Sequence, residues 1–239
     1  MKKVYLYKGF ERFWHWTQSL LIFFLMLTGF EIHGTYQLVG YENAVRWHDN
    51  AGWAFLILIV FTIFWHVTTG EWRQYVPTLT NMKAQMNYYL IGIFNNAPHP
   101  TGKRLLSKLN PIQRLTYFAL NILIIPVMLL SGFLYLYFNY PIQGIEINSL
   151  MPIAYIHTVG AYVLITFVII HLYLITTGRT LTSNLIAMIT GWEEMDEHEA
   201  EEAVQDVIDN ASQYVKPVNG DKKKKKKKKK KKDKKDKTD

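Results

Sequence analysis

The chain contains no cysteine among its 239 residues. This absence excludes disulfides, cysteine-ligated zinc, iron–sulfur clusters and the C-x-x-C-H attachment of c-type haem. Any metal must therefore be held by histidine or carboxylate side chains, and any metal-containing cofactor must be bound without a covalent link.

Charged residues are scarce in four long apolar stretches, at about residues 13–32, 49–69, 115–138 and 153–177. Each stretch has the roughly 20 residues that an α-helix needs to cross about 30 Å of hydrocarbon. Few charges are expected there, because an ionised side chain at the bilayer centre costs several kcal/mol. The sequence therefore predicts an all-α, integral membrane four-helix bundle. Pro126 predicts a kink in the third helix.

Excess positive charge is confined to the C-terminus, where residues 221–239 hold 14 Lys and 4 Asp. Without them the chain carries 13 basic and 15 acidic side chains, a net charge of −2. The formal charge of +8 therefore describes a tail, and we expect no nucleic-acid partner. We divide the chain into a transmembrane domain, residues 1–195, and a tail, residues 196–239. The tail is acidic and then lysine-rich, and it is predicted to be disordered.

Lysine and arginine are unevenly distributed among the connections. The N-terminal segment has four and the loop 70–114 has six, whereas the first connection has only Arg46 and the third, residues 139–152, has none. The positive-inside rule therefore places both termini and the long middle loop in the cytoplasm. We expect a multi-pass membrane protein in contact with lipid. Residues 81–94 are predicted to form a helix, either on the membrane surface or docked on the bundle.

Five of the eight histidines lie within the apolar stretches or at their ends, where an ionisable side chain usually has a function. His48 and His66 are 18 residues apart, so they share one helical face at a separation of about 27 Å. His157 and His171 are 14 residues apart, within about 40° of one face and separated by about 21 Å. His15 lies near the inner end of the first stretch. The spacing thus predicts histidines at two depths of the membrane.

Two imidazoles on opposite sides of a flat macrocycle are what a six-coordinate haem iron requires. His48 and His157 are positioned to form an outer pair, and His171 can form an inner pair with either His15 or His66. Zinc fits less well, because it prefers four ligands gathered at one point. A proton relay through these histidines is a further alternative.

Small and basic residues flank the predicted sites. Gly52 and Gly160 each lie one turn from an outer histidine, where a missing side chain lets a porphyrin approach the backbone. Gly160 and Gly52 are not explained by a proton relay. Arg12 precedes His15 by one turn, and Arg46 precedes the second helix's first histidine by two residues. Both arginines are candidates to pair with haem propionates, or they serve as ordinary interfacial anchors.

The sequence resembles the four-helix di-haem cytochrome b subunits of bacterial respiratory complexes. These include the gamma subunit of formate dehydrogenase-N, the b-type cytochrome of NiFe hydrogenases and the cytochrome b subunit of thiosulfate reductase. The resemblance covers about residues 5–195 and rests on segments from every predicted helix. They are Glu11–Trp16, Thr28–Phe30, His48-x-x-x-Gly52 with Trp65 and Gly70, Asn110–Arg114, Ser131-Gly132, His157 to His171-Leu172-Tyr173, and Ala187–Gly191.

The resemblance implies that His48 and His157 hold an outer haem b and that His15 and His171 hold an inner one. It also implies a menaquinone or ubiquinone site beside the inner haem, near the start of the third helix. Asn110 and Gln113 are then candidates to hydrogen-bond the quinone oxygens. Equally, Asn110 is placed to cap that helix, with Pro111 at its first position.

These features favour a membrane anchor that carries electrons between the quinone pool and a redox subunit docked on the extracytoplasmic face. That subunit is expected to be a multihaem cytochrome c, a molybdenum oxidoreductase with its iron–sulfur subunit, or a hydrogenase. No catalytic residue is assigned, because the substrate chemistry would belong to the partner. One alternative is a stand-alone di-haem cytochrome linked to quinone. The other is a histidine-lined transporter of metal ions or protons. His66 keeps several roles open: iron ligand, quinone or proton binding, or a hydrogen bond within the bundle.

Overall fold

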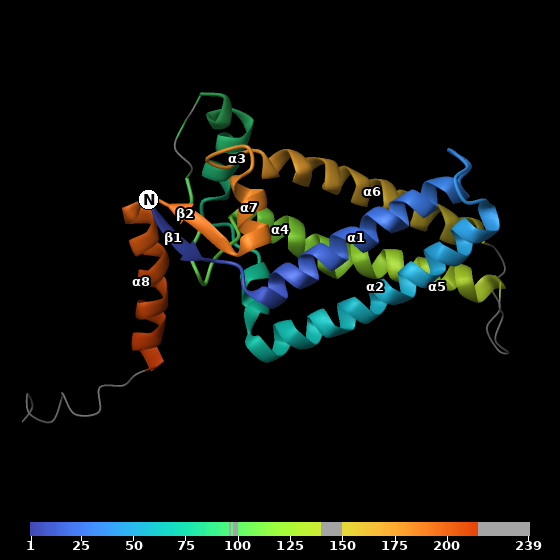
Figure 1. Ribbon diagram of the computed structural model, residues 1–239, viewed down its shortest axis with the longest axis horizontal. Helices are drawn as coiled ribbons and strands as arrows, with labels where there is room; N and C mark the ends of the chain where they lie inside the picture. Colours follow the sequence, from blue (N-terminus) through green and yellow to red (C-terminus); the bar gives the residue numbers. More distant parts are fainter. Residues whose placement is uncertain (96, 98–99, 140–149, 215–239) are drawn as a thin grey trace, which may run out of the picture.

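The structure, a computed structural model, describes residues 1–95, 97, 100–139 and 150–214. Its main body is a bundle of long helices that run side by side (Figure 1). They are α1 (Gly9–Ile32), α2 (Tyr41–Thr69), a third helix made of α4 (Pro111–Ala119), η3 (Leu120–Ile124) and α5 (Ile125–Asn139), and α6 (Met151–Ile175).

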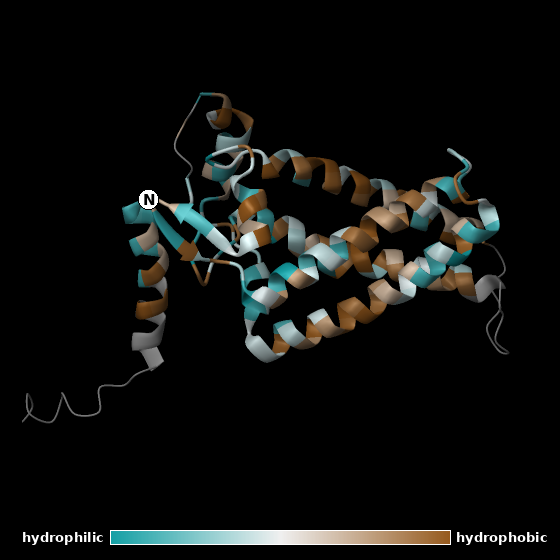
Figure 2. Ribbon diagram, in the orientation of Figure 1, coloured by the Kyte–Doolittle hydropathy of each residue, from teal (hydrophilic) through white to brown (hydrophobic). Residues whose placement is uncertain are grey.

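Within the described residues, four helices are long and apolar enough to cross a membrane: Gly9–Ile32, Tyr41–Thr69, Pro111–Leu136 and Met151–Ile175. The predicted four-helix membrane bundle is therefore confirmed. The second helix begins eight residues before the predicted stretch, because apolar content locates the lipid-facing part of a helix and not its first residue. Many large apolar side chains on the bundle face outward, among them Leu20, Phe64 and Ile169. Figure 2, a ribbon coloured by hydropathy, shows hydrophobic residues along the long helices, as expected where lipid replaces water.

The middle of the bundle is filled by apolar side chains from all of its helices. Ile22, Phe55, Leu120 and Ile125 are buried there. Leu164, which lies midway between the two histidines of α6, packs against this cluster. We call it the central cluster. It separates the two depths at which the sequence places histidines.

The third helix changes its winding just before Pro126. Residues Leu120–Ile124 form a π-helical turn, and α5 begins directly afterwards. Proline has no backbone N–H and its ring displaces the carbonyl one turn earlier, so it disturbs the regular α-helical hydrogen bonds. A π-helical turn is one of the recognised sites of helix distortion. The irregularity predicted from Pro126 is thus present as a wide turn.

One end of the bundle carries a small folded assembly, which we call the cap. It comprises β1 (Lys2–Tyr5), η1 (Glu71–Tyr75), α3 (Met82–Leu90), η2 (Gly92–Asn95), α7 (Ser183–Thr190), β2 (Trp192–Met195) and α8 (Glu197–Tyr214). β1 pairs antiparallel with β2, with Lys2 opposite Met195 and Tyr5 opposite Trp192. The first and last elements of the transmembrane domain are thereby joined.

Gly191 makes this junction possible. Its backbone has φ +88°, and its carbonyl accepts hydrogen bonds from the N–H groups of Leu6 and Tyr7 at 2.8 and 3.2 Å. A Cβ at this position would lie 2.7 Å from the Tyr7 carbonyl oxygen. Glycine is therefore required both by the left-handed backbone and by the close approach of the chain before α1.

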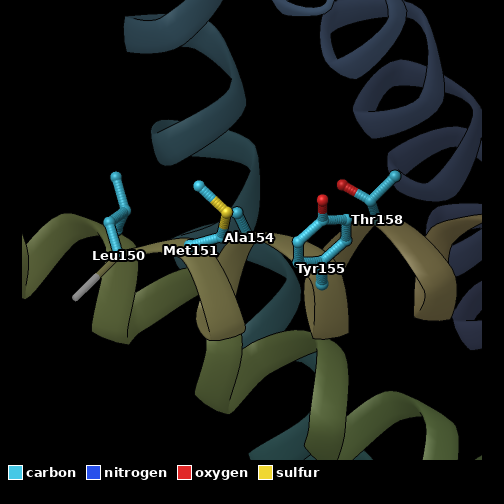
Figure 3. Close-up of a pocket in the computed structure, with 5 residues that line it drawn as sticks. All are labelled: Leu150, Met151, Ala154, Tyr155 and Thr158. Atoms are coloured by element: carbon cyan, nitrogen blue, oxygen red, sulfur yellow. The ribbon is translucent and has the colours of Figure 1, made fainter.

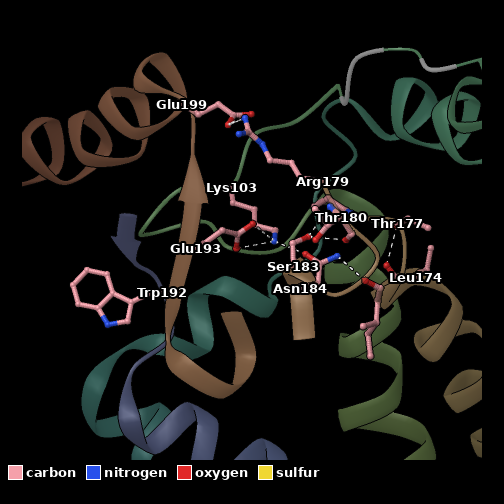
Figure 4. Close-up of polar contacts among 12 residues, drawn as sticks. Lys103, Leu174, Thr177, Arg179, Thr180, Ser183, Asn184, Trp192, Glu193 and Glu199 are labelled. Carbon is pink, nitrogen blue, oxygen red and sulfur yellow. Dashed lines mark hydrogen bonds and ion pairs between the residues drawn. The ribbon is translucent and has the colours of Figure 1, made fainter. Parts of the chain in front are cut away.

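Ion pairs fasten the remaining parts of the cap, as Figure 4 shows. Lys103 Nζ, from the loop before α4, contacts both carboxylate oxygens of Glu193 at 2.6 and 2.8 Å and Asn184 Oδ1 at 2.9 Å. Arg179 bonds Glu199 at 2.9 Å. The middle loop, α7, β2 and α8 are thus held together.

The sequence predicts disorder in the acidic segment after β2, but the structure has a helix there, α8 (Glu197–Tyr214) (Figure 1). Ala200 and Ala203 are buried against Leu6 and Met195. Alanines give a weak apolar signal in a sequence, although their small side chains allow close helix packing. The lysine tract lies outside the described residues.

The predicted loop helix is present as α3 and contacts α4, where Asn110 Nδ2 donates to Tyr89 Oη at 3.0 Å.

Candidate functional site

The outer pair forms between side chains of two long helices. His48 on α2 and His157 on α6 face each other with ring centroids 6.2 Å apart and ring planes at 71°. Both histidines lie at the end of the bundle away from the cap. The sequence spacing predicted this pairing, and the structure brings the two side chains together.

A hydroxyl group from another helix holds the His48 ring. Thr28 Oγ1, on α1, lies 2.9 Å from His48 Nδ1 and also lies 2.9 Å from the Phe24 carbonyl. A hydroxyl has one hydrogen, and a carbonyl only accepts. Thr28 therefore donates to Phe24 and accepts from His48 Nδ1–H. The lone pair on His48 Nε2 remains available for a ligand.

His157 is held in the same way by α5. Ser131 Oγ lies 2.8 Å from His157 Nδ1 and donates to the Val127 carbonyl at 2.6 Å. The residue after each hydroxyl is a glycine: a Cβ at Gly29 would lie 3.5 Å from the His48 ring, and one at Gly132 would lie 3.4 Å from the His157 ring. On the long helix before each outer histidine, a hydroxyl residue thus hydrogen-bonds the ring and the glycine after it leaves room for the ring.

The inner pair is made by His15 on α1 and His171 on α6. Their ring centroids are also 6.2 Å apart, with ring planes at 53°. Phe167 stacks on the His171 ring at 5.6 Å, and Tyr117 Oη lies 3.4 Å from His171 Nδ1. His15 Nδ1 is buried and has no hydrogen-bond partner among the described residues. The inner pair therefore has fewer hydrogen bonds than the outer pair.

His66 lies outside both pairs. Its Nδ1–H donates to the Thr62 carbonyl at 2.8 Å, on its own helix. Its ring is enclosed by Trp14, Trp65 and Tyr75, with centroids 5.0 to 5.5 Å away. Helical spacing alone allowed either His15 or His66 to face His171, and the structure places His15 there.

The separation within each pair suits one metal ion between two imidazoles. A metal–nitrogen bond is about 2 Å long, which puts an imidazole centroid about 3 Å from the metal. Two rings on opposite sides of one iron therefore have centroids about 6 Å apart, as both pairs do. No three His, Asp or Glu side chains in the described part of the chain come together to hold a metal ion. The arrangement fits bis-histidine haem and not a tetrahedral metal site.

The predicted flanking residues are only partly near the pairs. Nothing lies within 4 Å of a Cβ built on Gly52, so space remains beside it. At Gly160 the Met128 sulfur would be 2.6 Å from such a Cβ, so this glycine permits α5 and α6 to pack closely. Arg46 is exposed and bonds Asn43 at 2.9 Å. Arg12 donates to the Ile189 carbonyl at 2.6 Å, while its Nε is buried without a partner among the described residues.

Asn110 and Gln113 form the start of α4. Asn110 Oδ1 accepts from the Gln113 N–H at 2.9 Å, and Gln113 Oε1 accepts from the Asn110 N–H at 3.1 Å. With Pro111 at the first helical position, this is a complete capping box. The capping role considered from the sequence is therefore confirmed. Contact with a quinone stays a prediction.

A shallow apolar hollow lies at the start of α6 (Figure 3). It is lined by Leu150, Met151, Ala154, Tyr155 and Thr158. None of these residues was predicted to bind a ligand.

Comparison with known proteins places this geometry in context. The sequence model of a family described as "Prokaryotic cytochrome b561" matches residues 6–191. The chain is also 28% identical over 203 residues to a protein of Escherichia coli (strain K12) described as "Putative cytochrome YdhU". That alignment covers 80% of this chain and 75% of the relative. The family match includes all four paired histidines and ends at Gly191.

Proposed function

Because the chain belongs to the prokaryotic cytochrome b561 family, we propose that it holds two b-type haems and passes electrons between quinone and a redox partner. As a member of that family it is a b-type membrane cytochrome that transfers electrons. It is a multi-pass protein of the bacterial inner membrane. The number of haems, their ligands, the quinone and the partner are the parts that we propose.

The proposal rests on two imidazole pairs with the same 6.2 Å separation. We assign His48 and His157 to an outer haem, and His15 and His171 to an inner one. Haem supplies one-electron iron chemistry when it is bound. The chain fixes the positions of the imidazoles, since each histidine projects from a long helix, and the central cluster keeps water from the space between the pairs.

Removal of the Ser131 hydroxyl is expected to raise the midpoint potential of the outer haem. A hydrogen bond accepted from Nδ1–H makes an imidazole a more basic ligand, which favours ferric iron. Ser131→Ala removes that bond from His157. Spectroelectrochemical titration measures the change, and about tenfold weaker haem retention is expected with it.

Thr166→Ala is the matched control for this variant. Thr166 lies on α6, is exposed, and its hydroxyl bonds only the Tyr162 carbonyl of the same helix. The control should keep the potential of the unmodified protein. Equal potentials in Ser131→Ala and Thr166→Ala would contradict the role given to Ser131.

The distribution of basic residues supports a cytoplasmic cap and both termini on that side. The inner pair is the one nearer the cap, so we place the quinone there, at the start of α4. Gln113 Nε2 takes no part in the capping box and is available to donate to a quinone oxygen. Tyr117 Oη, beside His171, is a second available donor. Arg12 Nε is the candidate partner for an inner haem propionate.

The outer pair is proposed to exchange electrons with a docked extracytoplasmic redox subunit. Purification from native membranes, followed by addition of a short-chain quinol, tests the proposal. We expect the quinol to reduce both haems and a stoichiometric redox subunit to co-purify. Protein without a dithionite-reducible b-type band, or with haems that no quinol reduces, would contradict it.

A further inference from the structure

A buried ion pair lies next to the proposed quinone site. Lys108 Nζ contacts both carboxylate oxygens of Glu11 at 2.6 and 2.7 Å. The Lys108 side chain is only 5% exposed and that of Glu11 13%. Lys108 precedes Asn110 by two residues, so its ammonium group enters the cap where α4 begins. The charge pair is therefore close in sequence to the capping box that we place beside the quinone.

A hydrogen-bonded network links the buried pair to the surface. The Lys8 N–H donates to Glu11 at 2.7 Å, and the Lys8 ammonium forms an ion pair with Glu71. Gln74 links Glu71 to the backbone of Lys108: its amide donates to Glu71, and its oxygen accepts from the Lys108 backbone N–H at 3.4 Å. The Lys8 side chain is 56% exposed. The exposed Lys8 is therefore connected, through its backbone N–H and Glu11, to the Lys108 ammonium, and through Glu71 and Gln74 to the Lys108 backbone.

Two neutral phenols lie near the ion pair. Lys108 Nζ lies 5.9 Å from the centre of the Tyr7 ring, and Tyr75 packs against His66. Burial raises the pKa of Tyr7 and of Tyr75 above the ordinary value, with nearby carboxylates adding to the effect. Both phenols therefore keep their hydrogen, so each hydroxyl can accept one proton while it donates another.

The acidic member of the outer part of the network stays ionised. Burial acts to raise the pKa of Glu71, but its bond with Lys8 and the charge of Lys108 outweigh that effect and hold the pKa below its usual value. Glu71 is thus a fixed negative charge next to the exposed Lys8 side chain. It stabilises a proton that arrives on Lys8 or Lys108.

A buried ion pair is a weak source of stability, because desolvation offsets most of the attraction between the charges. Apolar side chains of similar size would hold α1 to the middle loop as well or better. Another cap ion pair, between Lys103 and Glu193, is more exposed. Burial, position and connection to water together give the Glu11–Lys108 pair a role beyond packing.

We propose that the Glu11–Lys108 pair relays protons between the cytoplasm and the quinone at the start of α4. This inference rests on the proposed function. Quinone reduction takes up two electrons and two protons and gives quinol. The electrons come from the inner haem, and Lys108 Nζ releases an N–H proton towards a quinone oxygen. The neutral amine then recovers a proton from water on the side of Lys8 and Glu71, and it releases the second proton to the other quinone oxygen in the same way. Quinol oxidation follows the same steps in reverse.

Lys108→Arg is the most informative variant. Arginine keeps the positive charge and the contact with Glu11, but it does not release its proton in proteins. Lys103→Arg, at the ion pair between Lys103 and Glu193, is the matched control. The purified complexes are mixed with a short-chain quinol, and stopped-flow absorbance follows haem reduction across a range of pH in water and in deuterium oxide.

Lys108→Arg is expected to retain both haems and their potentials, yet to reduce them at least about tenfold more slowly, in line with the loss of a positioned proton-transfer group. A larger solvent isotope effect should accompany the slower rate, and Glu11→Gln should behave likewise. Haem reduction by quinol at the unmodified rate in Lys108→Arg would overturn the relay. Loss of haem from both Lys108→Arg and Glu11→Gln would overturn it as well. Failure of quinol to reduce the unmodified protein would instead contradict the proposed function itself.

Discussion

Replacement of His48 or His157 by alanine is expected to remove one haem and to leave the other in place. The two histidines share one site, so loss of either removes an axial ligand of the same iron. The inner pair lies beyond the central cluster, about 21 Å along α6 from His157 to His171. Haem content should therefore fall from two to one per polypeptide in both variants, as measured by pyridine haemochrome absorbance against protein concentration.

His66→Ala is the control for the outer-haem variants. His66 bonds only its own helix through Nδ1 and packs among aromatic rings, so its removal should leave both haems bound. The assignment of the outer haem fails if His48→Ala and His157→Ala keep the haem content and spectrum of the unmodified protein. Loss of haem from His66→Ala alone would make His66 a ligand.

Replacement of His171 or His15 is expected to abolish quinol oxidation while the outer haem remains bound. The inner pair lies next to Tyr117 and the start of α4, where we place the quinone. Without the inner haem, electrons from quinol have no acceptor nearby, whereas the small reductant dithionite still reaches the outer haem. We expect a loss of at least about a hundredfold in the rate of quinol-driven reduction, about 2.7 kcal/mol in activation free energy.

Comparing reduction by quinol with reduction by dithionite distinguishes the loss of the inner haem from general misfolding of the protein. Dithionite should still reduce one haem per polypeptide in His15→Ala and His171→Ala. Quinol-driven reduction of the remaining haem at the normal rate would show that quinone reacts elsewhere, and the placement of the quinone beside the inner pair would then be wrong.

Helical periodicity predicted much of the site. Apolar length gave the four spans, and the separations of 18 and 14 residues placed histidines at two depths on α2 and α6. Periodicity did not decide between His15 and His66, because that choice depends on how α1 and α2 rotate against α6. Thr28 and Ser131 hydrogen-bond the rings of His48 and His157, but they were not identified from the sequence as hydrogen-bond partners. Their signal was a hydroxyl residue followed by glycine inside an apolar helix.

The cap was much less predictable. β1 and β2 pair although nearly the whole chain separates them, and four-residue strands have no periodicity that a sequence reveals. α8 has alanines where a stronger apolar face would have marked a helix. The buried Glu11–Lys108 pair depends on the fold of the middle loop, so sequence spacing gave no indication of it.

The amount of haem b bound to the purified, unmodified protein tests the central claim most directly. Two bis-histidine sites predict two haems per polypeptide, with low-spin spectra in both oxidation states. A single haem per polypeptide, or a high-spin iron with an open axial position, would contradict the assignment of both histidine pairs as ligands.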